Sequence, residues 1–266
     1  MIKLAFLVLF ALSQTAYAQS SGPEIPDDLM PNVRSAEIDG AAIYRYDHAA
    51  AVATDAALTL KEFQKDRRIA GWLTEDEGRS TIVTFYGNEA SPGALYQVTV
   101  SDSGSVVGSP RTLEPAVPLT STQSAQVSAR SVASKSGFAP CSKSYNPVVL
   151  ARSSNGVNTW SVYMLAGTTT TGVLPAGGNY RIDTDETGKN IISTRGFTKS
   201  CIELTMDRRA DALMLTHLMD PTPTEIHVFL NLLAGKPMYL ITTKNSFIWS
   251  IENGKIKFIQ KAQPKG

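Results

Sequence analysis

The first half of the chain changes from a helical hydrophobic period to the period of strands. Residues 19–40 show no regular pattern, so we expect an extended segment that leads into the first domain. Residues 41–46 predict a strand, and Asp47 is placed to cap a helix at residues 48–65. Apolar residues there recur at three- and four-residue steps, which indicates a half-buried helix. This apolar stripe comprises Ala49, Val52, Ala53, Ala56, Leu60 and Phe63.

Alternating and β-branched segments follow the helix and predict an antiparallel meander. The expected strands are residues 69–74, 80–86, 94–100 and 106–113. Short turn segments that contain glycine separate them. Residues 41–114 are therefore predicted to form an N-terminal α+β domain, in which one helix packs on a meander.

The composition changes over residues 115–137, where two prolines precede a stretch rich in Ser, Ala, Thr and Gln. Two interpretations remain open for this stretch. A thin apolar stripe favours a short amphipathic helix, and the polar composition favours a flexible connector. The stripe comprises Ala125, Val127, Ala129 and Val132. We place a domain boundary here.

The second half, residues 138–262, predicts a β-rich α+β domain with one clear helix. The expected strands are residues 147–152, 159–166, 180–184, 190–194, 201–204, 212–218, 238–242, 247–251 and 255–259. The helix is expected at residues 223–234, with Thr222 as N-cap, Pro223 at the first position and Glu225 as the capping-box partner. Its expected buried stripe comprises Ile226, Phe229, Leu230 and Leu233.

The N-terminus has the features of a secretory signal peptide. A positive residue precedes the apolar run 4–12, and residues 16–18 read Ala-Tyr-Ala, the small-x-small pattern that signal peptidases accept. The run is shorter than the ~20 residues that span a bilayer. We expect cleavage of residues 1–18, no membrane span in the mature chain, and a periplasmic or secreted location.

Charge and cysteine content narrow the function classes. The chain carries 25 Lys and Arg against 24 Asp and Glu without a basic block, which argues against a nucleic-acid partner. The two cysteines, Cys141 and Cys201, predict a disulfide in an oxidising compartment, and two separate buried thiols are the alternative.

The histidines suggest one place where chemistry is conceivable. His217 and His227 lie on either side of a Pro/Thr loop that contains Asp220. Imidazole and carboxylate groups are suitable zinc ligands, so these three residues are the candidate metal ligands. Glu225 and His217 are the candidate catalytic residues. The structural alternative makes Glu225 a helix-capping residue, His217 an ordinary hydrogen-bonded histidine, and His227 an exposed or rim residue beside the buried stripe.

The loop carries a local resemblance to a known family. Residues 216–225 read THLMDPTPTE, and with the helix and the strand 237–241 that follow they resemble the active-site loop of JAMM/MPN metallopeptidases. In that family a strand ends in His-x-His-Pro and a Pro-Ser-x-x-Asp element opens the next helix. Here Met219 takes the place of the second histidine and His227 that of the acid. The resemblance implies a divergent zinc-dependent hydrolase whose ligand set is degenerate.

The chain as a whole also resembles uncharacterised exported bacterial proteins, in residues 46–48, 53–55 and 217–229. Other enzyme motifs are not found, and the three tryptophans fit core packing or, alternatively, a ligand platform. The leading hypothesis is a non-enzymatic exported protein that binds a protein or small-molecule partner in the cell envelope through its second domain, without a cofactor. An envelope-accessory protein held in a complex and the zinc hydrolase are the alternatives.

Overall fold

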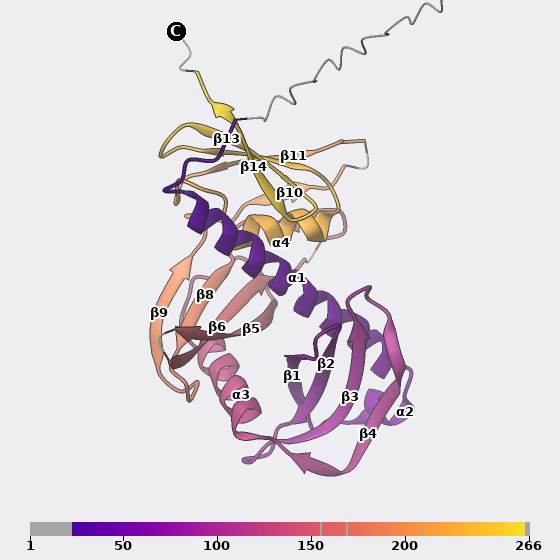
Figure 1. The fold of residues 1–266 in the computed structure, drawn as a ribbon. Coiled ribbons are helices and arrows are strands. Elements are labelled where there is room, and N and C mark those ends of the chain that lie inside the picture. Colours follow the sequence, from indigo (N-terminus) through magenta and orange to yellow (C-terminus); the bar gives the residue numbers. More distant parts are fainter. Residues whose placement is uncertain (1–22, 155, 169, 208, 264–266) are drawn as a thin grey trace, which may run out of the picture.

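The computed structural model describes residues 23–154, 156–168, 170–207 and 209–263, and the predicted signal peptide lies outside this part. Within these described ranges, four helices and fourteen strands form the α+β fold class that the sequence predicts (Figure 1). The helices are α1 (Met30–Ala57), α2 (Lys61–Lys65), α3 (Ser121–Ser134) and α4 (Glu225–Ala234).

Helix α1 corrects the prediction for the beginning of the chain. Residues 30–40 are not extended and residues 41–46 are not a strand, because both belong to one helix of 28 residues. Buried residues at helical spacing explain this, namely Val33, Ala36, Gly40 and Ile43. The aromatic and β-branched residues near Tyr44 favour a strand locally, but burial of this stripe overrides that weak preference.

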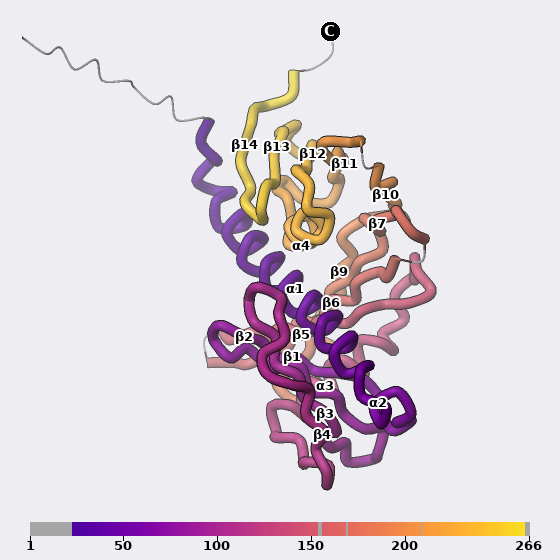
Figure 2. Tube along the Cα trace, turned by 90° about the vertical axis from the view of Figure 1, so that its right-hand side faces the viewer, coloured from indigo at the N-terminus to yellow at the C-terminus, as the bar shows by residue number. Residues whose placement is uncertain are grey.

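The two halves of α1 are buried in different hydrophobic cores. Val33, Ala36 and Ile43 pack with α4 and the C-terminal sheet, whereas Ala49 and Ala53 pack with the N-terminal meander. Figures 1 and 2 show α1 running from one part of the molecule to the other. The helix predicted at residues 48–65 is thus the end of α1 followed by the short α2. A continuous helix therefore connects the two predicted domains.

The predicted meander is confirmed. Its strands are β1 (Ile69–Asp76), β2 (Ser80–Gly87), β3 (Gly93–Ser101) and β4 (Val106–Pro118), in that order and antiparallel throughout. Phe63 of α2 contacts Phe85 and Tyr96 edge-to-face, which closes the core beneath α1.

Helix α3 resolves the open question about residues 115–137 in favour of a helix. Thr120 and Gln123 form a reciprocal capping box at its start. The amide of Gln126 donates to the Thr74 carbonyl of β1 at 3.0 Å, and Arg130 donates to the Trp72 carbonyl at 2.6 Å. The guanidinium of Arg130 also lies over the Trp72 ring. The segment is therefore fastened to the first sheet and is not a loose connector.

Three sheets make up the second half. The first contains β5 (Tyr145–Ser154), β6 (Val157–Ala166), β8 (Tyr180–Thr184) and β9 (Ile191–Gly196), antiparallel in that order. The second pairs β7 (Val173–Pro175) with β10 (Glu203–Thr205). The third contains β11 (Leu213–His217), β12 (Met238–Thr242), β13 (Phe247–Glu252) and β14 (Lys255–Lys261). Strands β11 and β12 are parallel, with α4 between them in sequence.

The predicted disulfide is confirmed, with Cys141 and Cys201 bonded at 2.05 Å. It joins the segments that precede β5 and β10. Such a bond fits an oxidising compartment outside the cytoplasm. None of the helices in the described part of the chain is both long and apolar enough to cross a membrane.

Gly40 permits the close packing of α1 on α4. A Cβ atom at this position would lie 2.5 Å from Val228 Cβ and 2.6 Å from the Glu225 carbonyl oxygen. Both distances are shorter than a carbon atom tolerates, and Val228 is fully buried. The two helices would have to separate to accept any side chain here.

We predict that Gly40→Ala lowers the free energy of unfolding by about 1–3 kcal/mol, because overpacking outweighs the helix propensity gained. Ala41→Gly, at the exposed neighbouring position, is the control and should cost only about 0.5–1 kcal/mol. Urea unfolding measures both variants. A Gly40→Ala variant as stable as the wild type would contradict the close approach of the helices.

Candidate functional site

The start of α4 lies two residues later than the sequence predicts. Thr224, not Thr222, is the N-cap, and His227 instead of Glu225 stands at the third position and completes the capping box. Thr222 and Thr224 are both suitable N-cap residues. With Thr224 as the N-cap, the Glu225 side chain is not needed for the capping box and can form hydrogen bonds elsewhere. Leu233 was predicted to be buried and is 45% exposed, because only the first two turns of α4 are enclosed.

His227 is buried, which corrects the expectation of an exposed or rim position. Only 5% of it is exposed. Its Nδ1 accepts a hydrogen bond from the Thr224 backbone N–H at 2.9 Å. A neutral imidazole has one unprotonated ring nitrogen that accepts a hydrogen bond, and here that nitrogen is Nδ1, so the proton sits on Nε2. A zinc ion bound at Nε2 would require the proton to move to Nδ1, where it would face the Thr224 N–H. The capping hydrogen bond and zinc coordination therefore compete for the one free lone pair of the ring.

The other histidine is paired with an aspartate. His217 is buried at the end of β11, and its Nε2 lies 2.9 Å from Oδ2 of Asp220. The same carboxylate oxygen accepts from Arg195 of β9 at 2.7 Å. Burial acts to raise the pKa of Asp220, but the His217 hydrogen bond and the Arg195 charge outweigh it and hold the pKa below its usual value. The rings of His217 and His227 meet edge-to-face, with centroids 4.6 Å apart.

Glu225 belongs to a second polar network. Its Oε1 accepts from the Tyr163 hydroxyl at 3.1 Å and from Arg181 at 3.2 Å. Tyr163 in turn accepts from Arg152, which forms a bidentate pair with Asp39 of α1 at 2.6 and 3.0 Å. Burial raises the pKa of Tyr163, so its hydroxyl remains a donor. The network connects α1, the β5–β9 sheet and α4.

The predicted candidates thus come together without forming an open site. A cavity of about 150 Å³ adjoins the start of α4, and its two acids, Asp220 and Glu225, are each paired with an arginine. In the described ranges, no group of three or more His, Cys, Asp or Glu is arranged to hold a metal ion. No buried polar side-chain atom of these residues lacks a hydrogen-bond partner. In this arrangement Asp220 is bonded to Arg195 and Glu225 to Arg181.

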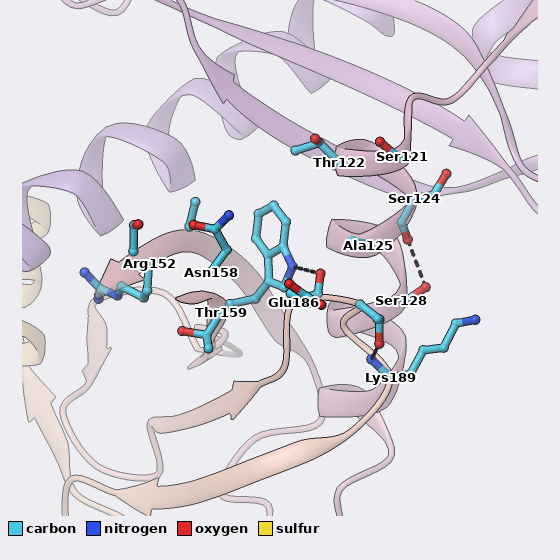
Figure 3. Close-up of a pocket in the computed structure, with 14 residues that line it drawn as sticks. Ser121, Thr122, Ser124, Ala125, Ser128, Arg152, Asn158, Thr159, Glu186 and Lys189 are labelled. Atoms are coloured by element: carbon cyan, nitrogen blue, oxygen red, sulfur yellow. Dashed lines mark hydrogen bonds between the residues drawn. The ribbon is translucent and has the colours of Figure 1, made fainter. Parts of the chain in front are cut away.

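A larger cleft lies elsewhere, between α3, the β5–β6 end of the second-half sheet and the turn that joins β8 to β9. Its volume is about 780 Å³. Figure 3 shows Ser124 and Ser128 of α3 on one side, Asn158 and Thr159 of β6 on another, and Glu186 and Lys189 of the turn close by. Its remaining polar lining comprises Ser121, Thr122, Arg152, Ser153 and Thr187.

The floor of the cleft is the part of the sheet face that α3 leaves uncovered. Beneath the helix the face is apolar and includes Val162 and Met164. Towards the β5–β6 turn the same face becomes mixed, with the cross-strand pairs Ala151–Trp160 and Ser153–Asn158. Trp160 marks this border, and its indole N–H donates to the Glu186 carbonyl at 3.0 Å.

The β8–β9 turn forms a fixed wall. A Cβ atom at Gly188 would overlap the Ala125 carbonyl, so glycine lets the turn touch α3 directly. Within the turn, Asp185 accepts from Asn190 Nδ2 at 2.6 Å and from the Lys189 backbone N–H at 3.1 Å. These bonds, led by the one from Asn190, lower the pKa of Asp185 to about 2. The wall therefore keeps its shape and charge at physiological pH.

This cleft was not predicted from the sequence. Trp160 fitted either core packing or a ligand platform, and residues 115–137 fitted either a connector or a thin helix. The lining residues come from α3, β5, β6 and a turn, so no sequence spacing relates them. One feature of the sequence pointed to the cleft: residues 115–137 combine many Ser and Thr side chains with an apolar stripe, as expected for a packed helix with a hydroxyl-rich exposed face.

Comparison with known proteins adds no relative. No family model, curated protein or solved structure matches the chain. The likeness to JAMM/MPN metallopeptidases therefore stays a prediction.

The burial of His227 predicts a pH dependence of stability. Burial, followed by the charge of His217, lowers the pKa of His227 to about 3, whereas an unfolded histidine titrates near 6.5. Between these two pKa values only the unfolded state binds a proton at His227. The contribution of His227 to the free energy of unfolding is therefore complete above about pH 6.5 and decreases as the pH falls towards 3, by about 2 kcal/mol between pH 7 and 5.

His227→Gln tests this, because glutamine keeps an acceptor for the Thr224 N–H and does not titrate. Urea unfolding at pH 7 and pH 5 should show a smaller pH loss for the variant than for the wild type. His48→Gln, at an exposed histidine of α1, should retain the wild-type loss. Equal losses in all three proteins would show that His227 is not the titrating group.

Proposed function

We propose that this is an exported, non-enzymatic binding protein that holds an uncharged saccharide in the α3 cleft. The observation that carries the proposal is the lining, in which hydroxyl and amide side chains surround the border with an apolar sheet face. Ligand pockets typically combine apolar surface with a few convergent polar groups. The disulfide supports export, since such bonds persist outside the reducing cytoplasm.

The kinds of hydrogen-bonding group favour a polyhydroxylated ligand. Serine and threonine hydroxyls both donate and accept hydrogen bonds. The side-chain amide of Asn158 donates through its NH2 group and accepts through its carbonyl oxygen. Sugar hydroxyls have the same dual character. A ligand with many hydroxyls therefore pairs with this lining without leaving unmatched donors.

The charges in the cleft favour an uncharged ligand. Glu186 and Lys189 carry opposite charges on the same turn. The guanidinium of Arg152, the third charged group, is already paired with Asp39. The cleft therefore lacks the excess of cations that recognition of a phosphate or carboxylate requires.

Binding of neutral oligosaccharides tests the proposal. Isothermal titration calorimetry of the full chain should detect binding of at least one of β-1,4-linked N-acetylglucosamine oligomers, β-1,4-linked glucose oligomers and α-1,4-linked glucose oligomers. Asn158→Ala and Ser153→Ala, at cross-strand neighbours on the cleft face, should each weaken that binding by roughly two- to tenfold, the value of one hydrogen bond between neutral groups.

Thr194→Ala is the matched control, because Thr194 is an exposed strand residue of β9 that does not line the cleft. It should bind like the wild type. The proposal is contradicted if none of the oligomers binds, or if binding is unaffected by both cleft variants.

A further inference from the structure

A second cleft adjoins α3 along a neighbouring stripe of the helix surface. Its volume is about 790 Å³, close to that of the first. The β2–β3 loop at Glu89 and Pro92, together with Ala116 and Pro118 of β4, forms its far wall. Its helix side includes Val127 and Ser131. This second cleft thus belongs to the first sheet, whereas the first cleft belongs to the second-half sheet.

The two clefts share part of their lining. Ser124, Ser128 and Lys189 border both. Ser124 and Ser128 are one helical turn apart, and the Ser128 hydroxyl donates to the Ser124 carbonyl at 2.9 Å. The two clefts therefore meet along these residues, so a ligand that fills the first cleft reaches the border of the second.

The combined surface is long. The lining residues of α3 extend from Ser121 to Val132, which corresponds to roughly 16 Å along the helix axis at 1.5 Å per residue. One sugar ring covers only a part of this length. A ligand that used the whole surface would need several units joined end to end.

The geometry points to a linear glycan chain that crosses α3 at Ser124 and Ser128 and occupies both clefts. This inference rests on the proposed function and specifies its ligand as a chain rather than a single sugar. The charge pattern of the second cleft agrees with it, since Glu89 adds an acid and the cation there, Lys189, is shared with the first cleft, so the combined lining has no excess of cations. The same uncharged chemistry therefore continues across the helix.

A length series tests the inference. For a glycan that binds, the affinity of the full chain should rise from the disaccharide to the hexasaccharide by at least about tenfold. The probes are β-1,4-linked N-acetylglucosamine oligomers and β-1,4-linked and α-1,4-linked glucose oligomers, measured by calorimetry. Ser131 is exposed and lines only the second cleft, so Ser131→Trp should remove this gain and leave disaccharide affinity unchanged.

Ser134→Trp is the matched control. It introduces the same side chain at another exposed serine of α3 that lines neither cleft, and it should keep the length dependence. Binding without any length dependence would overturn the chain inference and leave the proposed function standing. Absence of binding by every oligomer would overturn both. Binding of an extended peptide in their place would replace the glycan by a different class of ligand.

Discussion

The close approach of α1 to α4 at Gly40 determines how the rest of the chain packs. It brings the neighbouring Asp39 against Arg152 of β5, and the network then continues through Tyr163 to Glu225 at the start of α4. Each of these charged groups is costly to bury alone and is stabilised by its partners. Because α1 is continuous and a helix kinks sharply only at a specific feature such as an internal proline, the far end of α1 then sets the position of the N-terminal meander.

The α3 clefts follow from this arrangement. Helix α3 packs on the second-half sheet through Ala129 and Ala133, and it is fastened to β1 through Gln126 and Arg130. It is too short to cover the sheet face below it and too narrow to fill the space beside the meander. Two adjoining clefts remain along α3, and the proposed ligand uses the surface that the packing leaves free.

Local patterns predicted the strands well and predicted long-range packing poorly. The meander and the C-terminal strands alternate clearly, so their positions were read from the sequence. The first half of α1 was missed because its buried stripe of small residues is explained only by α4, which lies far along the chain. Of the candidate residues, His217, Asp220 and His227 lie together, and Glu225 belongs to a neighbouring network. Their pairing with Arg195, Tyr163 and Thr224 could not be read, since those partners lie on other elements or act through the backbone.

We expect α1 to join both halves into one cooperative unit that holds the walls of the clefts in place. Native-state hydrogen exchange along α1 measures this cooperativity. Amides in the middle of the helix, around Tyr44 to Asp47, should exchange only through the same global unfolding as those buried near Val33 and Ala53. A lower opening free energy for the C-terminal half of α1 together with the meander would contradict it, because the two halves would then unfold separately.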